Sequence, residues 1–260
     1  MTSSSPPLSS AARRAVFSSL AAEPRVDAVV RRIGDAIVLG LLGDGEQLPG
    51  ESELSARLGV ATVTLREALV VLRQQGLVTT RRGRGGGTFV RAPEDTLDDR
   101  LGARLLTHPT EELRDLADHW AALAGATARL AAERADAHDL DAPRRSLREF
   151  AEAEDPAARG RLDGRFHVEI AAAAQSARLT REEIRFQTEI GPLLCLAFNQ
   201  PEAHREADAQ HRALVDAVAS GDGTRARDLA EQHVHFGLRR LIERRLDGSW
   251  QQQSEAAPPS

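Results

Sequence analysis

The sequence predicts a mainly helical protein in two parts, a small N-terminal domain of helices with one β-hairpin and a larger all-helical C-terminal domain. Hydrophobic residues make up 41% of the 260 residues, aromatic residues only 3%, and Tyr is absent. The core must therefore consist mainly of Leu, Val, Ile and Ala, and such a composition favours helices. Apolar residues recur at helical spacing along most of the chain, and a β-prone pattern around a glycine-rich tip occurs once, in 77–90.

Positive charge is concentrated in one stretch of an otherwise acidic chain. Residues 57–91 carry seven Arg and one acidic residue, a net charge of +6, whereas the whole chain has a formal net charge of −5. The remaining residues therefore sum to −11. This distribution indicates a nucleic-acid-binding head on a separate acidic body. The alternative is a solvated basic loop.

Cysteine usage and hydropathy indicate the cellular compartment in which we expect the protein. The single cysteine, Cys195, excludes an internal disulfide and lies in an apolar run, where we expect a buried side chain. The N-terminus is polar and does not resemble a signal peptide, and no apolar run is long enough to span a bilayer. We therefore expect a cytoplasmic protein without a membrane partner.

The N-terminal part begins with a predicted flexible tail over 1–24, rich in Ser, Ala and Pro. An apolar stripe at helical spacing then predicts a helix over 25–42, ended by the Gly-Asp-Gly sequence at 43–45. Two further helices are predicted over 51–58 and 62–75, with a turn at Gly59 between them. Leucines line one face of the later helix, and a neighbouring face, roughly 70° away, carries the side chains of Thr62, Arg66 and Arg73.

A basic hairpin completes the predicted N-terminal domain, which spans 25–91. Two β-prone runs, 77–80 and 88–90, flank a tip of Arg and Gly residues. The whole pattern is typical of a winged helix-turn-helix. In such a domain the N-terminal residues of the second helix reach base edges in the major groove, and a basic wing grips the backbone or the minor groove.

Residues 92–108 form a predicted linker that contains one short helix, and Pro109 ends that helix. A helical pattern then continues through a predicted domain over 109–246, before a polar tail over 247–260. Glycine and proline breaks divide this domain into six predicted helices, over 111–135, 139–153, 156–175, 180–198, 202–219 and 223–246.

Acidic and imidazole side chains in the helical domain suggest a metal site. Asp163 and His167 are four residues apart and project from one helix face about 40° apart. His211 and His233 lie on later helices. One carboxylate and three imidazoles suit a divalent ion such as Zn, Ni or Mn, and helix bundles build such sites from facing helices. Spacing alone leaves open that these residues are buried for unrelated reasons.

The N-terminal pattern resembles the DNA-binding domain of the GntR family of bacterial transcription regulators. The matching pieces are Leu48-Pro49, Glu51, Glu53-Leu54, Leu58-Gly59-Val60, the run from Leu65 to Leu69, Leu72, Gly76-Leu77-Val78 and the run from Gly87 to Val90. The chain differs from many members at Ser52 and at Ala61-Thr62, positions that usually touch DNA. The resemblance implies that operator DNA is contacted by Ser52, Thr62, Thr64, Arg66, Arg73, Arg81, Arg82, Gly83 and Arg84.

The C-terminal pattern resembles the all-helical (FCD) effector domain of the FadR-type branch of this family. In many members an Asp-x3-His pair, a later His and another His 22 residues on bind a metal, and Asp163, His167, His211 and His233 match that order and spacing. The resemblance implies a metal at the floor of a pocket, with a small carboxylate effector completing its coordination. The family often has Arg and Glu where this chain has Trp120 and Ala124. The candidate pocket residues are Trp120, Arg129 and His204. For Trp120 the alternative is a core or interface position, and for Arg129 a solvated helix position is the favoured alternative.

These observations favour an effector-responsive transcription regulator, a repressor that binds two operator half-sites as a homodimer. The first alternative is a metal-dependent hydrolase, for which we find no general acid or base beside the four ligands. The second is a pure metal sensor, in which the metal is itself the signal.

Overall fold

The computed structural model describes Phe17 and residues 25–83, 85–91, 105 and 107–247. The chain divides into two compact units, residues 1–94 and 95–260. The division falls inside the predicted linker. The predicted tails and most of that linker, including its predicted short helix, lie outside the described residues.

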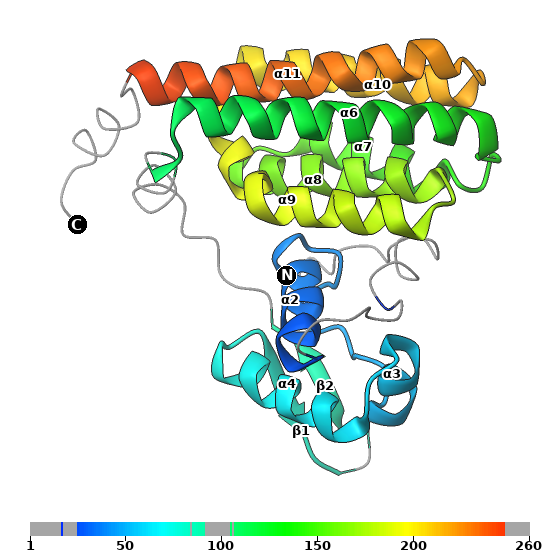
Figure 1. Ribbon diagram of the computed structural model, residues 1–260, viewed down its shortest axis with the longest axis vertical. Coiled ribbons are helices and arrows are strands. Elements are labelled where there is room, and N and C mark those ends of the chain that lie inside the picture. Colours follow the sequence, from blue (N-terminus) through cyan, green and yellow to red (C-terminus); the bar gives the residue numbers. More distant parts are fainter. Residues whose placement is uncertain (1–16, 18–24, 84, 92–104, 106, 248–260) are drawn as a thin grey trace. The chain divides into compact units, whose positions relative to one another are not determined.

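The N-terminal unit is a winged helix-turn-helix, as predicted (Figure 1). Helices α3 and α4 meet at Gly59, which adopts a left-handed conformation with φ of 67° and caps α3. Helix α4 packs on both α2 and α3, and its Leu65 and Leu72 are fully buried, so the apolar face faces the core. The elements are α2 Arg25–Val38, α3 Glu51–Leu58, α4 Thr62–Gln74, β1 Val78–Arg81 and β2 Gly87–Val90.

The first helix is shorter than predicted. It ends at Val38 rather than at residue 42, because Gly40 adopts a left-handed conformation with φ of 64°. The Gly-Asp-Gly sequence at 43–45 is therefore not its stop signal. Leu41 and Leu42 are buried although they lie beyond the helix. Because these two leucines continue the apolar spacing of the helix, the predicted helix is four residues too long. Their burial results from tertiary packing instead.

The wing contains more than the predicted hairpin. Strands β1 and β2 are antiparallel, with Val78 opposite Val90 and Arg81 opposite Gly87. On the other side of β2, Gln47 forms a bridge with Phe89, and the Leu48 amide donates to the Thr88 carbonyl over 2.9 Å. The segment before α3 therefore pairs with β2 through an isolated bridge and ties the wing to the helices.

The C-terminal unit consists of antiparallel helices (Figure 1). Predicted and observed boundaries agree within a few residues. Pro143 lies in the first turn of its helix, where it needs no hydrogen-bond donor, and Pro192 lies inside its helix. The helices are α6 Thr110–Arg134, α7 Asp141–Glu152, α8 Pro156–Ala173, α9 Ala177–Ala197, α10 Pro201–Ala219 and α11 Gly223–Asp247.

Helix α8 runs through the middle of this unit and carries two of the candidate metal ligands. It packs on α6, α7 and α9, while α11 packs along α6 and also meets α9 and α10. Gly160 lets α8 and α9 approach closely, because a Cβ there would lie 3.0 Å from the backbone nitrogen of Cys195. Cys195 is buried, as predicted. None of the described helices is long and apolar enough to cross a membrane.

Candidate metal centre and nucleic-acid interface

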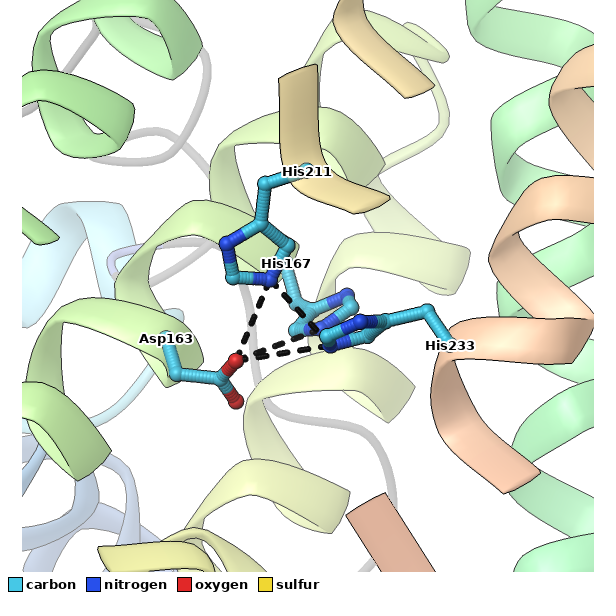
Figure 2. Close-up of side chains that lie close together, drawn as sticks. All are labelled: Asp163, His167, His211 and His233. Atoms are coloured by element: carbon cyan, nitrogen blue, oxygen red, sulfur yellow. Dashed lines mark hydrogen bonds and ion pairs between the residues drawn. The ribbon is translucent and has the colours of Figure 1, made fainter. Parts of the chain in front are cut away.

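Four predicted ligands converge inside the helical unit (Figure 2). Asp163 and His167 lie one turn apart on α8, His211 comes from α10 and His233 from α11. The Asp163 Oδ1 atom lies 3.2 Å from His211 Nε2, 3.4 Å from His233 Nε2 and 3.9 Å from His167 Nε2. One ligand atom from each residue falls within 4.8 Å of all the others. The fold therefore brings together, from three helices, the set that the sequence singles out.

The donor atoms of this cluster are buried and poorly satisfied. All four residues are at least 96% buried. Neither carboxylate oxygen of Asp163 accepts a well-formed hydrogen bond, and the Nε2 atom of His167 has no hydrogen-bond partner among the described residues. Buried polar atoms without partners are costly, and a bound ion is one of the few explanations for a group of them. The residues present therefore fit a divalent metal.

A neighbouring amide orients one of the imidazoles. The Nδ1 atom of His233 lies 2.9 Å from the Gln210 Oε1 atom, which can only accept, so Nδ1 carries the proton. The Gln210 amide is oriented in turn because its Nε2 donates to Glu206 over 2.9 Å. The Nε2 atom of His233 consequently faces the cluster, as in metal-binding histidines whose other ring nitrogen donates outward.

Burial and mutual contact set the protonation states. Burial lowers the pKa of His167 to about 3 and that of His211 to about 4, and the neighbouring imidazoles add to both shifts, while Asp163 opposes them. Burial alone would raise the pKa of Asp163, but the close imidazoles of His211 and His233 outweigh it and lower that pKa well below its usual value. A carboxylate beside neutral imidazoles is the state that binds a divalent ion.

A second buried polar group lies beside the cluster. The indole ring of Trp120 packs edge-on against His167, with ring centroids 5.3 Å apart. Its Nε1 donates over 3.0 Å to Glu183 Oε1, which also accepts a hydrogen bond of 2.9 Å from Gln187. Burial raises the pKa of Glu183 to about 7, although both hydrogen bonds oppose the rise. Neither Glu183 nor Gln187 stands out in the sequence, because an acid and an amide on an ordinary helix give no signal.

The three predicted pocket residues lie in different environments in the structure. Trp120 is buried beside the cluster, whereas Arg129 is exposed and pairs with Glu133 one turn away. Arg129 thus lies on an exposed helix face, the alternative that the sequence favours over a pocket position. His204 is buried, but its Nε2 lies 2.8 Å from the Phe150 carbonyl and has no ligand role that the structure reveals.

Histidines outside the cluster occupy other sites. His235 lines a surface cleft of about 250 Å³ between α6 and α11. His119 and His138 are exposed, and His108 is half-buried.

The predicted DNA contacts lie on an accessible surface of the N-terminal unit. Thr64 is half-buried, and Arg84 lies outside the described residues. Arg81 extends over the ring of Phe89, with the guanidinium carbon 4.5 Å from the ring centroid, and this contact fixes the base of the wing. The exposed positions are Ser52, Thr62, Arg66, Arg73, Arg81, Arg82 and Gly83.

Glu51 orients the central arginine of this surface. The Arg66 Nε atom donates to the Glu51 Oε2 atom over 2.7 Å, and both side chains are substantially exposed. Because the bond uses Nε, the two terminal amino groups remain available to a guanine edge or a phosphate. Sequence reasoning singles out Arg66 but not its partner Glu51, since fifteen residues separate them.

The start of α4 is also open to a ligand. Its N-cap, Ala61, has no side chain that can accept a hydrogen bond, so no capping bond forms. The first backbone N–H groups of a helix then lack a partner and favour negative charge, such as a phosphate.

A basic winged helix-turn-helix and a helical unit with a buried ligand cluster define a DNA-binding regulator. Comparison with known families agrees. Residues 25–90 match the family described as "Bacterial regulatory proteins, gntR family", and residues 115–236 match the FCD domain. The chain belongs to the GntR family of bacterial transcriptional regulators, in the FadR-like branch that carries an FCD domain.

Curated relatives cover nearly the whole chain. A putative HTH-type transcriptional regulator, RmpR, from Mycobacterium gastri is 43% identical over 94% of this chain and 89% of its own length. A putative L-lactate dehydrogenase operon regulatory protein from Escherichia coli is 30% identical over 81% of this chain and 83% of its own. Both are regulators rather than enzymes. The solved structure of Escherichia coli McbR/YncC, 16% identical, covers 86% of this chain and 99% of its own with a TM-score of 0.50, which supports the fold.

Proposed function

We propose that this regulator binds operator DNA as a homodimer and represses transcription until a small carboxylate binds at a metal held by Asp163, His167, His211 and His233. The observation that carries the proposal is the buried convergence of these four side chains on one point. The family relationship supports operator binding, dimerisation and control through the FCD domain. The metal, the class of effector and the sign of regulation are the proposed parts.

The ligand set supports a divalent ion. Three imidazoles and a carboxylate suit Zn, Ni or Mn, and a fixed buried set leaves room for an exogenous ligand only at the remaining coordination positions. When bound, the metal supplies a positive charge that attracts an anionic effector. Trp120 packs against His167 and would limit the space for an effector on that side of the ion, and Gln210 orients the His233 ring.

The class of effector rests on the metal and on one relative. A hard oxygen donor such as a carboxylate is a common ligand for these ions. The Escherichia coli relative is named for the L-lactate dehydrogenase operon, and lactate is a small carboxylate. Effector binding would change DNA affinity through a coupling free energy of about 1–3 kcal/mol, or roughly 5-fold to 150-fold.

A titration of the full chain tests the proposal. A duplex recovered by the protein from a random pool serves as operator, and affinity is measured with and without L-lactate and other small carboxylates. We expect at least one carboxylate to weaken DNA binding by fivefold or more, and Asp163→Ala to abolish that response while DNA binding persists. An unchanged affinity across the carboxylates would contradict the effector class, and a chain without metal would contradict the site.

The sensor alternative has a distinct signature. In a pure metal sensor, DNA affinity responds to physiological changes in free Zn, Ni or Mn without an organic ligand. In the proposed mechanism, DNA affinity follows the carboxylate once the ion is bound. The hydrolase alternative receives no support from the relatives, which are regulators.

A further inference from the structure

Two exposed valines lie on the second helix of the helix-turn-helix. Val63 has 62% of its surface exposed and Val70 has 44%, both on α4. Among the described residues, Leu246 in the other unit is the one further large apolar side chain with comparable exposure. Exposed apolar residues are ordinary when scattered. Two of three on a single short helix mark that surface as unusual.

The valines occupy the centre of the exposed face of α4. They are seven residues apart, so at 100° per residue their side chains differ in direction by about 20°. The buried Leu65 and Leu72 lie on the opposite side of the helix. Arg66, whose guanidinium is held by Glu51, lies about 60° from Val63 on the same exposed side. Val63 stands in the first turn and Val70 two turns later.

This arrangement fits one kind of partner. A surface that offers a guanidinium, open backbone N–H groups and a branched apolar side chain within one helical turn meets matching chemistry in the DNA major groove. There, phosphates and guanine edges accept hydrogen bonds from the polar groups, and the C5 methyl of thymine is the apolar group on a base edge. The phosphates of DNA also suit the start of α4, where Ala61 provides no side-chain cap.

We propose that Val63 determines part of the operator sequence by packing against a thymine methyl group in each half-site. The inference rests on the proposed binding of operator DNA. It adds that Val63 recognises a base through an apolar contact rather than a hydrogen bond. Arg66 then supplies the polar contact beside it. Val70 lies two turns further from the helix N-terminus, where recognition helices make fewer base contacts, and serves as the matched control.

Thymine and uracil provide the test, because deoxyuridine differs from thymidine only by the missing C5 methyl. The full chain first selects its operator from a random duplex pool, and each thymine of the selected site is then replaced by uracil. We expect one position per half-site at which the replacement weakens binding about threefold to fourfold, the factor expected for one buried methyl-sized group. Replacement in both half-sites should weaken binding about tenfold, because the two factors multiply.

The variants assign the contact to a residue. Val63→Ala should bind the thymine and uracil duplexes equally, while Val70→Ala should retain the full difference. Because Val63 is exposed, its substitution leaves the fold intact, which circular dichroism verifies. If uracil has no effect at any position, or if Val63→Ala still distinguishes the two duplexes, the inference is wrong. Failure to select any duplex would instead overturn the proposed operator binding, and this inference with it.

Discussion

The Nε2 atoms of His211 and His233 lie 3.1 Å apart although the residues come from different helices. With His233 protonated at Nδ1, both rings direct ring nitrogens toward the same oxygen of Asp163. Two imidazoles and a carboxylate this close together in an apolar interior are energetically unfavourable unless a proton or a cation lies among them. A divalent ion at this point would satisfy all three groups at once.

Removal of one ligand should lower both metal content and stability. We expect the purified chain to contain about one divalent ion, and His211→Ala to lose most of it. A ligand at 100 times its dissociation constant stabilises a folded protein by about 2.7 kcal/mol, so the melting temperature should fall when the ion is lost. Elemental analysis and thermal unfolding, with and without a chelator, measure both effects.

The exposed His138 gives the control for this experiment. His138→Ala should keep both the ion and the response to chelator. Equal metal content in the His211 and His138 variants would show that the ion binds elsewhere.

Glu183 should make stability depend on pH. Burial raises its pKa from 4.5 to about 7 in the folded protein, so its stabilising contribution is complete below pH 4.5 and is lost as the pH rises through 7. Each unit of pKa shift corresponds to about 1.4 kcal/mol, so the loss approaches about 3 kcal/mol. Glu183→Gln keeps the acceptor for Trp120 and removes the charge. Urea unfolding should show the variant gaining stability relative to the parent between pH 5 and pH 8, and a constant difference between them would be the contrary result.

Arg66 should contribute to DNA affinity through charge and through its fixed direction. Arg66→Ala is expected to weaken operator binding by about fivefold or more, since a base-reading arginine contributes about 1–3 kcal/mol. If it binds a phosphate instead, the slope of log affinity against log salt should fall by about one. Arg129→Ala, which removes an equally exposed arginine in the other unit, should alter neither quantity. Undiminished binding by the Arg66 variant would count against the assigned DNA surface.

The tip of the wing should tolerate no side chain at Gly86. A Cβ there would lie 2.6 Å from the Arg81 carbonyl oxygen and 2.8 Å from that of Gly83, and both are backbone atoms that cannot easily move. Gly86→Ala should therefore distort the tip and weaken DNA binding several-fold, with the helical unit unchanged. Thr80→Ala, at an exposed position on β1, is the matched control and should bind normally. A Gly86 variant with normal affinity would show that the wing does not touch DNA.

Much of the fold follows from periodicity. The helices of the C-terminal unit, the helix-turn-helix and the hairpin can be predicted because apolar spacing, glycine turns and β-prone runs are local signals. The predicted end of α2 is wrong by four residues, since Leu41 and Leu42 continue the apolar spacing after Gly40 has ended the helix. The bridge between Gln47 and Phe89 could not be predicted. It joins residues that are far apart in the sequence, and a single bridging residue shows no alternating β pattern.

The ligand set can be named from the sequence because its residue types are rare and their order resembles a known domain. The residues that orient or neighbour the ligands, and the residue that orients Arg66, cannot be named in this way. Gln210, Glu183 and Glu51 matter through geometry: each is an ordinary polar residue whose partner lies on another helix. The sequence likewise does not fix the place of Arg129, since a helical arginine occurs both on solvated faces and in pockets.

The contact between Trp120 and His167 has an optical consequence. The chain contains no tyrosine and two tryptophans, of which Trp250 lies outside the described residues. The emission of Trp120 arises from a buried indole whose edge meets a candidate ligand ring 5.3 Å away. A paramagnetic ion such as Ni or Mn at the four ligands should quench that emission, so the protein carries its own fluorescent indicator of site occupancy.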